Sequence, residues 1–191
     1  MSYNTPQEHS IINPLLVDKK CKEIQTAMNE LSWMQYAFAR AYKQVDEREG
    51  ARVVMPVVYQ ADRDYLSCMP NDALDGQTEA FSFVYVKQPQ SIELYDKYYA
   101  TQTCDISIIV FVNLLQIDST IDYRFTERLK LQVLNKLSKV GQLTVTSTYD
   151  DMEECYSDFT QTAIEAKYLD SRQFAALRFD AEVKYGNNCK I

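Results

Sequence analysis

The sequence predicts an α+β fold, with a mainly antiparallel sheet, a long N-terminal helix and two further helices packed on one side of the sheet. The first observation is the alternation of apolar and charged residues in LRFDAEVKY, within residues 173–185. Side chains alternate between the faces of a strand, so this segment predicts a closing strand with one apolar and one charged face. The second observation is an N-terminal apolar stripe at spacings of three and four, typical of an amphipathic helix. The stripe contains Cys21, Ile24, Met28, Leu31, Met34, Phe38 and Tyr42.

The N-terminal helix is expected to begin beside Pro14, with Asn13 as its N-cap, and to end near Gly50. Residues 1–13 are polar and are expected to form a flexible N-terminal arm. The chain has 191 residues, which is the size of one domain. Residues 14–191 are therefore expected to form a single α+β domain.

Three strands are predicted in the middle of the chain. RVVMPVVYQ (52–60) is rich in β-branched residues, but Pro56 cannot donate a hydrogen bond, which indicates an edge strand or a bulge. AFSFVYV (80–86) is a second strand. CDISIIVFVNLL (104–115) is apolar almost throughout, as is typical of a strand buried on both faces. The segment between the last two strands, 87–99, is interpreted as an irregular connection.

Two more helices and one more strand are expected before the closing strand. Apolar residues at steps of four predict a helix within 121–140, and the alternating segment 142–149 predicts a half-exposed strand. Asp151 and Glu154 form a capping-box pattern that predicts the start of the third helix. The apolar stripes of the two helices are Phe125, Leu129, Val133 and Leu137, and Met152, Tyr156, Phe159 and Ala163.

The composition limits the classes of partner. The formal net charge is −7 and the pI is near 4.8, so the chain repels phosphate at long range and is not expected to grip nucleic acid. The N-terminus has neither a basic start nor an apolar core, unlike a signal peptide. The longest apolar run is too short to span a bilayer. We therefore expect a soluble, intracellular protein with no membrane partner.

No cofactor or metal is expected. The five cysteines lie far apart in the sequence, no CxxC occurs, and the single histidine does not suit the common zinc patterns. Reduced, unpaired thiols are the expectation, either as small buried residues or as harmless surface thiols.

The sequence carries no catalytic signature. Its four glycines are scattered, which excludes a P-loop or a dinucleotide-binding fingerprint, and no G-x-S-x-G elbow occurs. His9, the one histidine, lies in the N-terminal arm, away from any positioned nucleophile. We therefore expect no enzymatic activity.

One alternative function stays open, that of a cytosolic ligand- or cation-binding domain or an enzyme of unknown type. Its polar site would combine Asp62 and Asp64 with the acidic segment 150–154, DDMEE, which runs from Asp150 to Glu154. Helix capping and the helix dipole explain the acidic segment more simply.

Two sets of residues are candidates for a subunit interface. On a continuous N-terminal helix, Trp33, Tyr36 and Arg40 would share the face opposite the core stripe, and these residue types dominate interface energetics. The alternative is that Trp33 tucks under a loop of its own chain.

The second set is the charged row of the closing strand, Arg178, Asp180, Glu182 and Lys184. Antiparallel self-pairing about Ala181 would place like charges opposite each other, which is destabilising. The row suits salt bridges to neighbouring strands, a head-to-tail contact or a solvated outer face.

The order of these segments resembles the tail-completion, neck or ring proteins of tailed bacteriophages, and most of all those of crAss-like phages. The resemblance covers roughly residues 14–185. It is carried by the PND turn (70–72), by Asn113 at the end of the buried strand, and by the closing Arg178-Phe179-Asp180 sequence.

The resemblance implies a structural virion protein, made in the host cytoplasm, that forms a homo-oligomeric ring of six or twelve subunits at the head–tail junction or in the tail. It implies contacts with other connector, portal or tail proteins, and DNA that passes through the ring without sequence-specific binding. It supplies no active-site residues.

Overall fold

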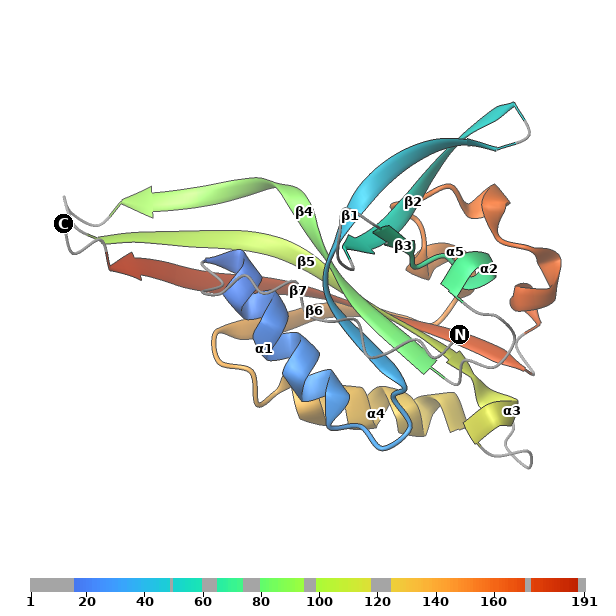
Figure 1. The fold of residues 1–191 in the computed structure, drawn as a ribbon. Coiled ribbons are helices and arrows are strands. Elements are labelled where there is room, and N and C mark those ends of the chain that lie inside the picture. Colours follow the sequence, from blue (N-terminus) through green and yellow to red (C-terminus); the bar gives the residue numbers. More distant parts are fainter. Residues whose placement is uncertain are drawn as a thin grey trace.

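The computed structural model describes residues 16–48, 50–59, 65–73, 80–94, 99–117, 125–170 and 173–188. These residues form an α+β fold with a seven-stranded mixed sheet and five α-helices (Figure 1). The elements are α1 (Val17–Asn29), β1 (Tyr36–Arg48), β2 (Ala51–Tyr59), β3 (Tyr65–Ser67), α2 (Pro70–Ala73), β4 (Ala80–Leu94), β5 (Tyr99–Asn113), α3 (Leu114–Ile117), α4 (Phe125–Leu137), β6 (Leu143–Tyr149), α5 (Met152–Cys155) and β7 (Phe174–Asn188), with 3-10 turns η1 (Gln161–Ala163) and η2 (Ala166–Leu169) between α5 and β7.

The strand order is β3-β2-β1-β4-β5-β7-β6. Strands β1 and β4 are parallel, and the other neighbouring pairs are antiparallel. The longest pairing is that of β5 with β7, which runs from Tyr99 opposite Asn188 to Asn113 opposite Phe174. β7 therefore lies inside the sheet, and β6 is the edge strand beside it.

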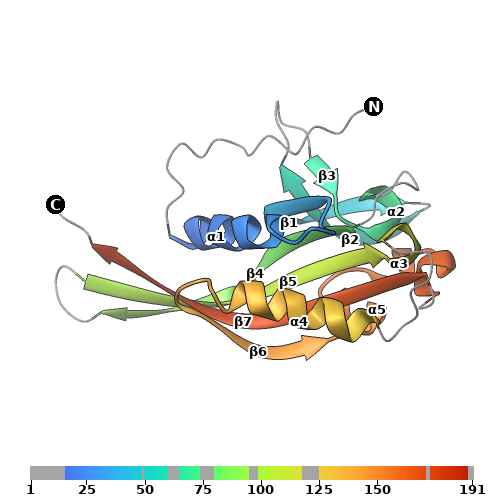
Figure 2. The same cartoon turned by 90° about the horizontal axis from the view of Figure 1, so that it is seen from below.

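Helices α1 and α4 cover one face of the sheet (Figure 2) and enclose a first core with it. The predicted apolar face of the closing strand lies in this core, where Leu177, Phe179 and Val183 are fully buried. The predicted helix at 121–140 is observed as α4, which buries Leu129 and Val133 in the same core.

The opposite face of the sheet carries a second core that is rich in aromatic rings. Phe83 and Phe111 project from β4 and β5, and Tyr156 and Tyr168 close over them from the segment between α5 and β7. The prediction that β5 is buried on both faces is confirmed, because its residues alternate between the two cores. The prediction that the helices pack on one side is wrong, since α5 covers this second face.

The N-terminal helix is shorter than predicted. α1 ends at Asn29, and the residues from Tyr36 form strand β1, which finds its partner in the parallel strand β4. Gly50, predicted to end the helix, has φ of +77° at the turn between β1 and β2, a conformation that glycine adopts without strain. The predicted start, Asn13 and Pro14, and residues 1–13 lie outside the described residues.

The prediction of an edge strand or a bulge at 52–60 is wrong, because the short strand β3 pairs with the outer side of β2 from Val57 to Tyr59, directly after Pro56. The carbonyl oxygen of Pro56 accepts a hydrogen bond from the Cys68 amide at 2.7 Å, on the side of β2 that faces away from β1. The missing donor of Pro56 points to the same side, so the β1–β2 ladder loses nothing.

Two other expected elements differ. The third helix is the single turn α5, and Tyr156 and Phe159 lie beyond its end. The segment 87–99 is not irregular, because β4 continues to Leu94 and β5 begins at Tyr99. A bulge between Val86 and Gln90, with Pro89 inside it, bends β4 at this point.

Beyond the bulge, three strands leave the body of the protein together. Residues 90–94 of β4, 99–104 of β5 and 183–188 of β7 form this β-arm, whose base still contributes Cys104, Val183 and Tyr185 to the first core. Figures 1 and 2 show the arm running out past α1 and α4, with the end of β7 at its tip.

Candidate functional site

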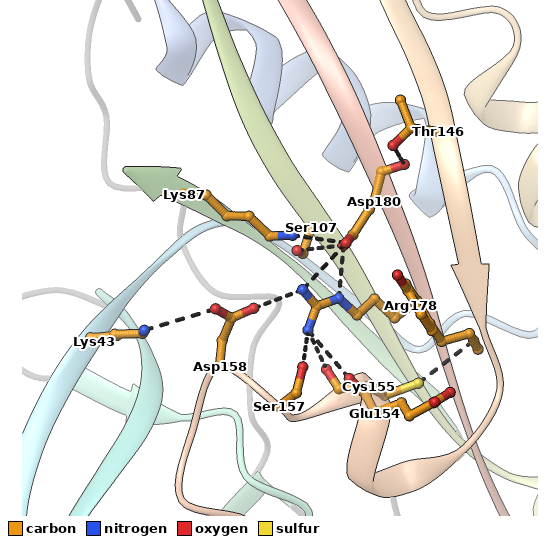
Figure 3. Close-up of polar contacts among 11 residues, drawn as sticks. Lys43, Lys87, Ser107, Thr146, Glu154, Cys155, Ser157, Asp158, Arg178 and Asp180 are labelled. Carbon is orange, nitrogen blue, oxygen red and sulfur yellow. Dashed lines mark hydrogen bonds and ion pairs between the residues drawn. The ribbon is translucent and has the colours of Figure 1, made fainter. Parts of the chain in front are cut away.

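The most connected polar site lies on the second face of the sheet, around Arg178 (Figure 3). We call it the Arg178 cluster. Its members come from β1, β4, β5, β7 and the segment after α5: Lys43, Lys87, Ser107, Ser157, Asp158, Arg178 and Asp180.

Arg178 is the centre of the cluster, and only 5% of its surface is exposed. Its Nε donates to Asp180 Oδ1 at 2.7 Å, and its Nη1 donates to Ser157 Oγ at 2.8 Å. Its Nη2 lies 2.8 Å from Asp158 Oδ2. The carbonyl of Glu154, at 3.3 Å, accepts a further bond from Nη1. One guanidinium therefore ties β7 to the segment that follows β6.

The Asp180 carboxylate also binds side chains from two other strands, β4 and β5. Lys87 Nζ on β4 lies 2.8 Å from Oδ2, and Ser107 Oγ on β5 donates to Oδ1 at 2.7 Å. Burial by itself would raise the pKa of Asp180, but the hydrogen bonds from Arg178, Lys87 and Ser107 outweigh burial and lower that pKa. Asp180 is therefore held as a carboxylate.

Asp158 connects the cluster to β1. Its Oδ1 lies 3.9 Å from Lys43 Nζ, and the Lys43 ammonium also lies over the rings of Tyr85 and Phe159. The cluster contains three cations and two carboxylates, and every one of them has an opposite charge beside it. This arrangement clamps the polypeptide, because it joins strands β1, β4, β5 and β7 to the segment after α5.

The four residues of the charged row on the closing strand therefore lie in different environments. A solvated outer face is wrong for Arg178, which is buried under the α5 segment, whereas salt bridging between strands is observed for Asp180. Farther along β7, Lys184 is exposed, and its Nζ lies 3.4 Å from Glu182 Oε1. Residues 178–183 are flanked by β5 and β6, so this stretch of β7 has no open edge for self-pairing.

The other predicted interface set does not form one surface. Trp33 lies in the connection between α1 and β1, is 8% exposed, and donates from its indole nitrogen to Gln132 Oε1 of α4 at 2.7 Å. Tyr36 stacks on Phe38 beside the second core, on the opposite side of the sheet from Trp33. Arg40 binds Asp18 of α1 at 2.9 Å and lies over the ring of Tyr42. The shared helical face predicted for these three residues is wrong, because α1 ends before them.

The acidic segment 150–154 behaves as a helix cap. Asp151 Oδ1 accepts hydrogen bonds from the amides of Glu153 and Glu154 at 2.9 and 3.2 Å, which confirms the capping explanation. Asp150 is paired with Lys130 at 2.8 Å. A groove of about 760 Å³ lies beside them, and Phe174, Ala175 and Ala176 are among the residues that line it. Within the described part of the chain, no group of three or more acidic, cysteine or histidine residues could hold a metal ion.

Several earlier candidates fall elsewhere. Asp62, Asp64, His9 and Cys189 lie outside the described residues. The four cysteines that the structure describes are free, as expected, and all four are buried: Cys21, Cys68, Cys104 and Cys155. In the same described part of the chain, no helix is long and apolar enough to cross a membrane.

Sequence reasoning missed five members of the cluster: Lys43, Lys87, Ser107, Ser157 and Asp158. Only Ser107 left a local signal, since it interrupts the apolar run of a strand buried on both faces. A buried hydroxyl requires a polar partner, and that partner is Asp180. The lysines reach the cluster through strand order, whereas Ser157 and Asp158 reach it through the segment after α5.

Comparison with known proteins does not assign the chain to a family. No protein-family model matches the chain, and a search of curated proteins finds none that is similar to it.

Proposed function

We propose that this chain is a structural virion protein, a subunit of a homo-oligomeric ring at the head–tail junction or in the tail of a tailed phage. The observation that carries the proposal is the β-arm, which leaves the body past α1 and α4 (Figure 1). A small group of strands needs packing partners for stability. A projecting arm of this kind gains those partners when subunits assemble.

Two further observations support the ring. In the most connected polar cluster of the described residues, each charged group has an opposite charge within ion-pair distance, which suits a clamp, and the sequence carries no catalytic signature. The net charge of −7 would repel the phosphates of DNA in a channel and let the DNA pass without gripping it. Other connector, portal or tail proteins would be the neighbours of such a ring.

The test is the mass and shape of the assembled protein. Purified full-length chain is studied by light scattering and electron microscopy, alone and after co-expression with the portal and tail proteins encoded beside it. We expect closed rings of six or twelve subunits, alone or in the complex. A chain that stays monomeric and binds none of these proteins would contradict the proposal.

The groove beside the acidic segment favours one second candidate, a site for a cation or a cationic ligand. A rise in melting temperature with millimolar Ca²⁺ or Mg²⁺, lost in Asp150→Asn, would support it. The existing bonds of Asp150 to Lys130 and of Asp151 to the α5 amides make this the weaker candidate.

A further inference from the structure

The β-arm has two outer edges, one formed by β4 and the other by β7. β1 pairs with β4 only from Phe81 to Tyr85, so no described strand pairs with the outer side of residues 90–94. β6 pairs with β7 only as far as Val183, after which the Lys184 amide donates to the Gln142 carbonyl at 3.0 Å. In the part of the chain that the structure describes, the outer side of residues 186–188 likewise carries no strand.

The two edges run in the same direction. β4 reaches the tip at Leu94, opposite Ala100 of β5, and β7 reaches it at Asn188, opposite Tyr99. Both strands are antiparallel to β5, which lies between them, and are therefore parallel to each other. When such arms stand side by side around a rotation axis, the β7 edge of one arm meets the β4 edge of the next as a parallel pair.

Such a contact is heterologous, because two different edges meet. Heterologous contacts close into rings when the rotation between subunits allows it. Unpaired strand edges are ready-made templates for another strand, and full closure removes them. A two-fold contact would join β4 to β4 or β7 to β7 and leave the other edge open on each subunit.

We propose that the β-arms of neighbouring subunits pair edge to edge, with residues 186–188 of one subunit parallel to residues 90–94 of the next, and that this closed wall of strands lines the channel. The occupant of each edge is a second copy of this chain. This inference rests on the proposed ring function. It specifies the contact, its direction and its repeating unit of three strands per subunit.

Disulfide trapping tests the contact. In a Cys189→Ser background, Ser91, Ile92, Glu93 and Leu94 are changed to cysteine one at a time, each with and without Asn187→Cys. The four positions sample both faces of β4 and several staggers. Within one subunit β5 separates residues 91–94 from Asn187 by roughly 10 Å, which exceeds the ~7 Å limit between Cα atoms in a disulfide. A cross-link therefore reports two subunits.

We expect at least one double variant, when oxidised as the ring or its complex, to give a covalent ladder up to the full ring number. Each single variant should stay uncross-linked. Dimers from a single variant would show a two-fold contact and overturn the inference. Intact rings with no ladder in any double variant would also overturn it, while leaving the ring function standing. Absence of rings in every preparation would overturn both.

Truncation supplies a second measurement with a matched control. A chain that ends at Tyr185 lacks the β7 edge, whereas a chain that ends at Asn188 keeps it. Both should fold with the wild-type circular dichroism spectrum. We expect the shorter chain to lose the ring and the longer chain to keep it. Equal ring formation by both would overturn the inference.

Discussion

The Nη2 of Arg178 lies 2.8 Å from Oδ2 of Asp158, and this ion pair joins strand β7 to the segment that covers the second core. Tyr156 and Phe159, which flank Ser157 and Asp158 in this segment, are buried in the second core. The same guanidinium holds Asp180 at 2.7 Å through its Nε. The buried Arg178 cation thus helps to fasten the covering segment to the sheet.

Replacing that cation should be costly. Arg178→Met keeps an apolar stem of similar length but leaves Asp158 and Asp180 without their strongest partner. Removing one member of a buried ion pair typically costs about 3–5 kcal/mol of unfolding free energy. Urea unfolding followed by circular dichroism measures the loss. Lys184→Met, an exposed change on the same strand, is the control and should cost less than about 0.5 kcal/mol. Equal effects of the two substitutions would show that the cluster is not a clamp.

Stability should fall in acid through Asp180. Its folded pKa lies below the ordinary value of 3.8, so its contribution is present above that value and is lost as the pH falls through the folded pKa. Asp180→Asn should therefore be less stable than wild type at neutral pH. The difference in melting temperature between the two proteins should narrow below about pH 4. Melting temperatures across an acid series measure this. Glu182→Gln makes the same charge change on the same strand without the Arg178 contacts. A difference that stays constant with pH would contradict the prediction.

Replacing Trp33 should lower the stability of the fold more than it affects assembly. Its indole is buried against α4 and hydrogen-bonded to Gln132, so Trp33→Ala should cost about 3–5 kcal/mol of unfolding free energy. Trp33 is the single tryptophan, so its fluorescence should shift to longer wavelength when the chain unfolds. A Trp33→Ala protein of wild-type stability that fails only to assemble would show that the indole acts at an interface.

The buried thiols should be unreactive in the folded protein. Burial raises the pKa of Cys21 to about 12 and of Cys104 to about 11, and it also raises the pKa values of Cys68 and Cys155. The thiolate is the reactive form, so a thiol reagent at pH 8 should find almost none of it. In Cys189→Ser we expect no rapid reaction in native buffer and four thiols in denaturant. Rapid native labelling would mean that the core around one of these cysteines opens.

Sequence patterns predicted those elements whose buried residues recur at a regular spacing along the chain. Leu177, Phe179 and Val183 alternate along β7, and Leu129 and Val133 recur along α4, so each pattern identified its buried face. The cap at Asp151 could be predicted because it depends only on the next three residues. The Arg178 cluster could not, since its members are brought together by strand order and by a covering segment some twenty residues upstream.

The sequence by itself determined the α+β class, the apolar face of β7 and the double burial of β5, because side-chain periodicity records which faces avoid water. Only the tertiary structure decided that α1 stops at Asn29. Leu31, Met34, Phe38 and Tyr42 keep a helical spacing, but residues 36–41 gain backbone hydrogen bonds by pairing in parallel with β4. Tertiary structure also decided that Arg178 is buried. The segment around α5 covers the charged face of β7 at this residue. The buried guanidinium is tolerated because two carboxylates, a hydroxyl and a carbonyl oxygen contact it there.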